Sequence, residues 1–274
     1  MKTRIISGVV FAILGIIFLM INNPIVDTVV VTLLALIGMR EYFNAFKSTK
    51  IKPIKWVGYI ACLGILMYGN SLLDTATKVM VLKIMLPISV IGTFCYIVLT
   101  NLKRTIVDIA ITFFGILYVP LLFIFLKLIL TIPDYGRLYF IYVIIAAFVS
   151  DTAAYFIGCK FGKNKLCPDI SPKKSVEGAV AGVVAVAVVF AIYTAILKIY
   201  ANVDFSIILM VVAGIISAIA GQFGDLSASA VKRYCKIKDF GNIMPGHGGV
   251  LDRFDSILFV APMIYAFINI YLLK

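Results

Sequence analysis

The sequence has few of the residues that build zinc or redox centres. It contains one histidine, His247, and its five cysteines are an odd number whose spacings match no zinc or redox motif. Because zinc in proteins is held mainly by several nitrogen and sulfur ligands, one histidine alone does not build such a site. Acids are scarce as well, with 13 Asp and Glu against 25 Lys and Arg.

The chain also lacks the features that end a secretory signal. Lys2 and Arg4 precede an apolar run that resembles a signal peptide, but no small-residue cleavage site follows it, and further apolar runs come at once. No periodic repeat and no low-complexity segment occurs. We therefore interpret the first apolar run as a transmembrane helix.

Long apolar runs fill most of the sequence. Hydrophobic residues make up 62% of the chain, whereas soluble domains are closer to half apolar, and about twenty apolar residues cross a bilayer as a helix. The pattern predicts an all-α, polytopic integral membrane protein of about nine transmembrane helices. The nine runs are Ile5–Ile21, Ile25–Met39, Trp56–Leu73, Val79–Leu99, Ile106–Ile132, Leu138–Ile157, Gly178–Ile199, Phe205–Gly221 and Val250–Leu273. The fifth run is long enough either to tilt in the membrane or to include a break at Pro120.

The basic residues indicate the orientation of these runs. Of the 25 Lys and Arg, 19 lie at the N-terminus and in the connections that share its side of the membrane. Positive residues favour the cytoplasmic side, so we expect the N-terminus to be cytoplasmic and the protein to lie in the cytoplasmic (inner) membrane. The excess of positive charge then indicates contact with anionic lipid headgroups, and nucleic acid is not expected as a partner.

Charged and hydroxyl residues gather between residues 221 and 256, which read GQFGDLSASAVKRYCKIKDFGNIMPGHGGVLDRFDS. On a helix, Asp225, Ser229, Lys232 and Lys236 share one face, because the last three follow Asp225 by four, seven and eleven residues. An acid, a hydroxyl and cations in one stripe suit a polyphosphate bridged by a divalent cation. Arg233 lies beside this face.

A glycine-rich segment, residues 241–249, follows and contains His247. Glycines let backbone N–H groups turn toward an anion. The helix predicted after it begins with Asp252 and Asp255, three residues apart, so both carboxylates can face one site. Hard oxygen ligands from Asp225 and Asp252 favour Mg²⁺ over zinc. Each of these charges taken singly is also compatible with a simple ion pair or a turn at the headgroup level.

Two upstream segments carry further candidates. Asp151 lies late in the sixth run, and an acid within a membrane run is costly and marks functional sites. The segment 171–177, SPKKSVE, places Lys173, Lys174 and Ser175 before the seventh run, where a phosphate can bind at a helix start. The alternatives are a local ion pair for Asp151 and a solvated basic loop for the segment.

The stretch 221–256 resembles the signature of the phosphatidate cytidylyltransferases, or CDP-diacylglycerol synthases. The residues that carry the resemblance are Ser229, Lys232, Arg233, Lys238, Asp239, Pro245, His247, Gly248, Gly249, Asp252, Arg253 and Asp255. The segments SDTAAYFIGCKFG and SPKKSVEG are also similar to the family. The resemblance is close from about Ser150 onward, whereas the N-terminal half is similar only in hydropathy.

This resemblance implies transfer of a cytidylyl group from CTP to phosphatidate, which gives CDP-diacylglycerol and pyrophosphate. It also implies a homodimer with a cavity open to the cytoplasm, a requirement for Mg²⁺, and K⁺ as a possible second cation. Within one membrane domain, 1–274, we expect residues 1–135 to form the scaffold and dimerisation helices and residues 136–274 to form the catalytic helices.

The resemblance and the charges together assign roles to single residues. We expect Asp225 and Asp252 to bind the metal, with Asp151 and Asp255 as further ligands. The expected catalytic residues are Asp225, Asp252, Lys232, Arg233 and His247. The expected substrate-binding residues are Lys173, Lys174, Ser175, Ser229, Lys238, Gly248, Gly249 and Arg253.

Two other functions stay open at this point. A CTP-dependent lipid-alcohol kinase shares a membrane fold and a nucleotide but directs attack to the γ-phosphorus. An ion-coupled transporter would use Asp151 and Asp225 as coupling acids, although it has no use for the combined Lys-Arg and glycine-rich cluster.

Overall fold

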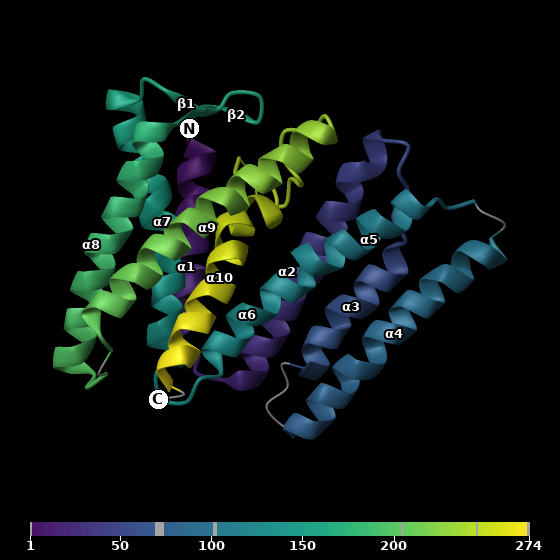
Figure 1. Cartoon of the computed structure of the whole chain (residues 1–274), viewed down its shortest axis with the longest axis horizontal. Helices are drawn as coiled ribbons and strands as arrows, with labels where there is room; N and C mark the ends of the chain where they lie inside the picture. Colours follow the sequence, from purple (N-terminus) through teal and green to yellow (C-terminus); the bar gives the residue numbers. More distant parts are fainter. Residues whose placement is uncertain (1, 69–73, 101–102, 204, 245, 273–274) are drawn as a thin grey trace. The chain divides into compact units, whose positions relative to one another are not determined.

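A computed structural model gives the fold, and it describes residues 2–68, 74–100, 103–203, 205–244 and 246–272. Each predicted apolar run is helical over most of its described part, and the ends of the third and ninth runs, at 69–73 and 273, lie outside the described residues. The helices are α1 Lys2–Met20, α2 Pro24–Ala45, η1 Phe46–Ser48, α3 Lys55–Tyr68, α4 Thr75–Leu99, α5 Ile106–Tyr118, α6 Pro120–Leu130, α7 Gly136–Phe161, α8 Val176–Tyr200, α9 Ile207–Tyr234 and α10 Leu251–Leu272 (Figure 1).

Prolines and caps determine where several of these helices begin and end. Of the two alternatives for the fifth run, the break is confirmed, because α5 ends at Tyr118 and α6 begins at Pro120. Proline has no N–H to donate and clashes with the preceding turn, so it is tolerated only in the first turn of a helix without a kink. Pro24 begins α2 in the same way, where the side chain of Asn23 accepts the N–H groups of Ile25 and Val26.

A small β-hairpin interrupts the helical pattern between α7 and α8. Its strands, β1 Lys165–Cys167 and β2 Ser171–Ser175, pair in an antiparallel ladder in which Lys165 faces Ser175 and Cys167 faces Ser171. The sequence pattern predicted only a basic loop here. In the part that the structure describes, the other regular elements are helices apart from one isolated bridge between Met244 and Gly248, so the prediction of an all-α protein is correct in all but this hairpin.

Among the residues that the structure describes, five helices are long and apolar enough to cross a membrane: Ile106–Leu130 (which joins α5 and α6), Gly136–Phe161, Val176–Tyr200, Ile207–Tyr234 and Leu251–Ile270. One face of α8 supports this interpretation, because Val180, Val184, Val188 and Ile192 recur every fourth residue and are more than half exposed. A contiguous apolar stripe of this kind is costly in water and is typical of contact with lipid. These helices are those of a multi-pass membrane protein.

The chain folds into two compact units. The first comprises residues 1–131 and 234–253, and the second comprises residues 132–233 and 254–274. In the first unit α2 packs against α3 and α6, and α3 packs against α4 and α5. The division of the chain at residue 135 into scaffold and catalytic helices stays a prediction.

In the second unit α7 and α8 lie side by side (Figure 1). Their backbones approach closely because glycines face each other: a Cβ added at Gly178 would lie 2.6 Å from the carbonyl oxygen of Ala154 and 3.2 Å from the Cα of Gly158. Small residues at such crossings let membrane helices pack through van der Waals contact. The pair therefore forms a tight frame from which the hairpin extends.

We predict that Gly178→Ala lowers the thermal unfolding midpoint of the protein in detergent, because the added methyl group has no room against the α7 backbone. Overpacking of this kind costs about 1–3 kcal/mol. The matched control is Gly15→Ala in α1, where an added Cβ meets nothing within 4 Å. Equal midpoints for Gly178→Ala and the wild type would contradict the close packing of α7 on α8.

Candidate active site

Three acids and two lysines of the second unit gather around α9. Asp255 on α10 interacts electrostatically with Asp225 and Lys232 on α9 and with Asp151 on α7. The Nζ atom of Lys174 on β2 lies 2.5 Å from Oδ2 of Asp225. We name these five residues the acid–lysine cluster. The structure therefore brings together three of the four acids that the sequence analysis assigned to a metal.

Close helix packing places the two carboxylates of α9 and α10 beside each other. A Cβ added at Gly224 would lie 2.5 Å from the carbonyl oxygen of Asp255, so the backbones of α9 and α10 approach next to Asp225. Asp255 is buried, with 7% of its surface exposed, and its Oδ1 accepts the N–H of Ser256 at 2.8 Å. Neighbouring buried carboxylates repel each other, so cations nearby are required to stabilise them.

The polar face of α9 is shorter than the sequence spacing predicted. The hydroxyl of Ser229 lies 3.5 Å from Oδ1 of Asp225, as expected for residues one turn apart. The helix ends at Tyr234, however, and Lys236 has a left-handed φ of 54°. The prediction that Lys236 shares the face of Asp225 was wrong, because the chain has turned out of the helix before it. Arg233, at the end of α9, donates from Nε to the carbonyl oxygen of Ile170 at 3.3 Å.

The hairpin that carries Lys174 is held at its base by backbone hydrogen bonds. The hydroxyl of Ser175 accepts the N–H of Gly178 and caps α8, so the Ser175 oxygen is engaged at the helix start. Glu177 accepts the N–H groups of Lys163 at 3.1 Å and Asn164 at 3.1 Å. These contacts position Lys174 against Asp225, while the neighbouring Lys173 is exposed.

The glycine-rich segment belongs to the first unit and is organised by Asp252. One oxygen of this carboxylate, Oδ2, accepts the N–H groups of Phe240 at 2.7 Å and Gly249 at 3.0 Å. Gly248 has a φ of 85°, a conformation that glycine adopts without strain. His247 forms a hydrogen bond between Nδ1 and the hydroxyl of Ser7 at 2.7 Å. The segment is thus a defined turn that leads into α10.

Glu41 on α2 lies beside the glycine-rich segment and was not predicted from the sequence. Its carboxylate, 4% exposed, accepts the N–H groups of Val250 at 3.0 Å and Leu251 at 2.9 Å, and it packs against Gly241 and Gly249. Burial raises the pKa of Glu41, which lies beyond the apolar run 25–39, and the two N–H donors oppose that rise. Glu41 therefore caps the start of α10.

The remaining predicted residues divide between the two units. Lys238 and Arg253 are exposed residues of the first unit, and Pro245 lies outside the described residues. Because Asp225 belongs to the second unit and Asp252 to the first, the expectation that they share one cation stays a prediction.

The acid–lysine cluster has the chemistry of a site for a hard cation. Carboxylates are the oxygen donors that a hard cation prefers, and the ammonium group of Lys174 already occupies a cation position against Asp225. Within the described parts of the chain, no three Asp, Glu, His or Cys side chains are arranged to enclose a metal ion by themselves. Mg²⁺ commonly takes one or two carboxylates and completes its shell with water and substrate phosphates, so the residues present fit Mg²⁺.

Comparison with known proteins identifies relatives over nearly the whole chain. Residues 2–271 match the model of the family described as "Cytidylyltransferase family". The chain is 32% identical over 271 residues to a phosphatidate cytidylyltransferase of Bacillus subtilis, which covers 97% of this chain and 96% of the relative. It is 31% identical to one of Staphylococcus saprophyticus and 32% identical to one of Staphylococcus aureus, each over 96% of this chain and 97% of the relative. The similarity therefore extends through the N-terminal half, where the sequence analysis found only a hydropathic likeness.

We predict that Glu41→Ala lowers the thermal unfolding midpoint and increases amide hydrogen exchange at residues 246–252. Loss of the carboxylate leaves two buried N–H groups without an acceptor, at a cost of about 1–3 kcal/mol each. The control is Glu41→Gln, which keeps an acceptor oxygen and the side-chain volume and is expected to lose less. If both variants exchange as slowly as the wild type, Glu41 does not hold the start of α10.

Proposed function

The chain belongs to the cytidylyltransferase family, and on that basis we propose that it transfers a cytidylyl group from CTP to phosphatidate for phospholipid biosynthesis. The products are CDP-diacylglycerol and pyrophosphate. The observation that carries the proposal is the acid–lysine cluster, in which carboxylates from α7, α9 and α10 lie among Lys174 and Lys232. A site with both signs of charge suits a reaction between two phosphates and a cation.

The reaction joins two anions, and charge neutralisation is its main requirement. A phosphate oxygen of phosphatidate attacks the α-phosphorus of CTP, a new P–O bond forms, and the bond from the α-phosphorus to the bridging oxygen breaks as pyrophosphate leaves with the electron pair. The attacking oxygen is already an anion at neutral pH, so a strong general base is not needed. Lys174 and Lys232 lower the repulsion between the reactants and orient their phosphates.

Asp225, Asp151 and Asp255 are the residues of the second unit that would hold Mg²⁺, together with Asp252 as the sequence predicts. Bound there, the ion would neutralise phosphate charge and align the triphosphate. Lys174 is the residue whose pairing would change, because a cation at Asp225 releases its ammonium group to a phosphate. K⁺ stays a proposal for a second cation on the same oxygen donors.

The other predicted residues have proposed roles at the phosphates. Lys173, Arg233, Lys238 and Arg253 supply positive charge, and Ser229 supplies a hydroxyl beside Asp225. The N–H groups of Gly248 and Gly249 are proposed to meet phosphate oxygens, although the N–H of Gly249 is engaged by Asp252 in this state. His247 is proposed to act on the leaving pyrophosphate, and Ser175 supports the position of Lys174 through its cap on α8.

The membrane places the two substrates on either side of one site. We propose nine membrane crossings in the cytoplasmic membrane, with the N-terminus and the segment 221–256 on the cytoplasmic side, as the basic residues indicate. CTP then arrives from water while the acyl chains of phosphatidate stay in lipid. We also propose that the protein is a homodimer and that the helices of residues 1–135 form the contact between its two subunits.

We predict that the purified protein, given phosphatidate, CTP and Mg²⁺, releases pyrophosphate and forms CDP-lipid, and that Asp225→Asn lowers kcat by about 100-fold or more, the range for loss of one preorganised charge contact. Asp169→Asn, at an exposed acid of the same unit, is the control and should keep the wild-type rate. Formation of CDP with a phosphorylated lipid would instead indicate a kinase, and ion flux into liposomes without CTP would indicate a transporter. A wild-type rate for Asp225→Asn would remove this acid from the proposal.

We also predict that Lys232→Gln raises the KM for CTP or phosphatidate by about tenfold, because one charge-assisted contact to phosphate contributes about 1.5–3 kcal/mol. Lys236→Gln is the matched control, since this exposed lysine lies outside α9. Steady-state kinetics with each substrate varied in turn measures the effect. Equal KM values for both variants would show that Lys232 does not contact a phosphate.

A further inference from the structure

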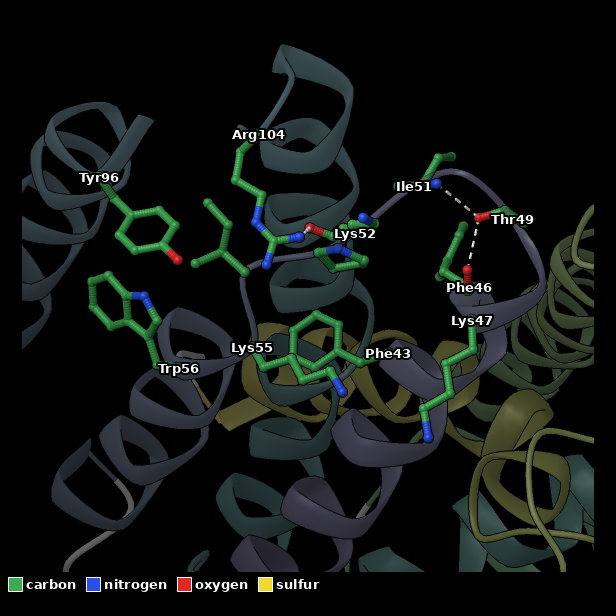
Figure 2. A pocket seen from close by; sticks show the side chains of 12 residues that line it. Phe43, Phe46, Lys47, Thr49, Ile51, Lys52, Lys55, Trp56, Tyr96 and Arg104 are labelled. Carbon is green, nitrogen blue, oxygen red and sulfur yellow. Dashed lines mark hydrogen bonds between the residues drawn. The ribbon is translucent and has the colours of Figure 1, made fainter. Parts of the chain in front are cut away.

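A cavity in the first unit has no part in the proposed reaction. It encloses about 560 Å³, within the range of small-ligand sites, and it is formed by the end of α2, the segment 46–54, the start of α3, the end of α4 and the α4–α5 connection. Twelve residues line it, and all of them are shown in Figure 2: Phe43, Phe46, Lys47, Thr49, Ile51, Lys52, Pro53, Ile54, Lys55, Trp56, Tyr96 and Arg104.

Aromatic and aliphatic side chains form most of its wall. Phe43, Phe46 and Ile54 are almost fully buried, whereas Trp56 is 44% exposed. The rings of Trp56 and Tyr96 meet edge to face at 6.2 Å between centroids and form one side of the cavity in Figure 2. Trp and Tyr are enriched where a protein meets the headgroup layer of a membrane, because their rings combine an apolar body with a polar tip.

Four cations line the same cavity, and no carboxylate does. No ion pair joins Lys47, Lys52, Lys55 or Arg104 to an acid among the residues that the structure describes. The acid next to this region, Asp108, is buried, and its two oxygens accept the backbone N–H groups of Lys52 and Thr105. The cavity therefore presents positive charge that the protein itself does not neutralise.

Arg104 also joins the α4–α5 connection to the segment 46–54. Its Nη1 donates to the carbonyl oxygen of Lys52 at 3.0 Å, and Figure 2 shows its guanidinium between the Trp56–Tyr96 pair and Lys52. This contact leaves further N–H donors of the same guanidinium for an anion. The cations and the apolar side chains that line the cavity are thus held close to one another.

We propose that this cavity binds the headgroup of an anionic phospholipid. The phosphate lies against Lys52, Lys55 and Arg104, and the glycerol and first acyl carbons lie along Trp56, Tyr96 and Ile54. Basic pockets at membrane helix ends are suited to such headgroups. A free phosphate or a nucleotide would use the cations but would leave most of the wall facing water, so the wall favours a lipid.

The site is one for binding and not for chemistry, because it contains no carboxylate to hold a metal and no nucleophile beside the cations. It goes beyond the proposed cytidylyl transfer and does not depend on it. A binding measurement tests it even if the proposed reaction were wrong.

Trp56 is the one tryptophan of the chain, so its fluorescence reports on this cavity alone. The protein is placed in phosphatidylcholine bilayers that contain a fixed mole fraction of either phosphatidylglycerol or phosphatidylcholine with brominated acyl chains, which quench tryptophan on contact. We expect the relative binding constant from quenching to be at least about tenfold higher for phosphatidylglycerol, because each cation near an anionic lipid contributes about fivefold and three cations are assigned to the phosphate.

The double variant Lys52→Gln with Lys55→Gln removes two of the three cations assigned to the phosphate and should lower this ratio by about fivefold or more. The matched control, Lys50→Gln with Lys103→Gln, removes the same charge from exposed lysines of the α2–α3 and α4–α5 connections that do not line the cavity, and it should keep the preference. Both pairs are exposed, and the backbone N–H of Lys52 that meets Asp108 is unchanged.

Three outcomes would overturn the proposal. Equal quenching by the two lipids in the wild type would show no preference for an anionic headgroup. An equal loss in both double variants would show that the preference is bulk charge attraction and not a site. Complete reversal of the preference by inorganic phosphate would show that the cations bind phosphate without the lipid wall.

Discussion

A carboxylate removed from water is stable only when N–H groups or cations replace the water that it has lost, and this constraint organises the polar part of the protein. Glu41 meets two N–H groups at the start of α10, Asp252 meets the N–H groups of Phe240 and Gly249, and Asp225 meets Lys174. For Glu41 and Asp225 the partner comes from a distant stretch of the chain. The acids therefore fix the course of the loops around them as well as supplying candidate ligands.

Much of the helical architecture follows from residues that are close in sequence. Apolar runs predict the helices because lipid requires every backbone group to be satisfied within the segment, and Pro120 predicts the break between α5 and α6 because it lacks an N–H. The end of α9 was not predictable in this way: no breaker precedes Lys236, whose left-handed backbone depends on how the following segment packs. The hairpin between α7 and α8 was missed because SPKKS has no alternation of apolar residues.

The candidate site was likewise predictable only where it depends on residues that are close in sequence. The pattern of residues 221–256 predicts membership of the family, which the match over residues 2–271 confirms. It predicts Asp225 and Lys232 on one face of a helix, whereas the pairing of Asp225 with Asp252 at a metal stays a prediction. Glu41 was missed because a charge at the end of an apolar run is usually a solvated helix end, and its partners lie more than 200 residues away. Only tertiary packing shows that this acid caps α10.

The connection between α7 and α8 is short and is attached at both ends. Its first residues donate to Glu177, its last residue caps α8, and the two helices that it joins cannot separate at Gly158 and Gly178. The position of Lys174 is therefore set by the packed helices α7 and α8 and not by the loop itself. A change in the length of this hairpin would therefore move the ammonium group away from Asp225, although the helices on either side keep their own packing.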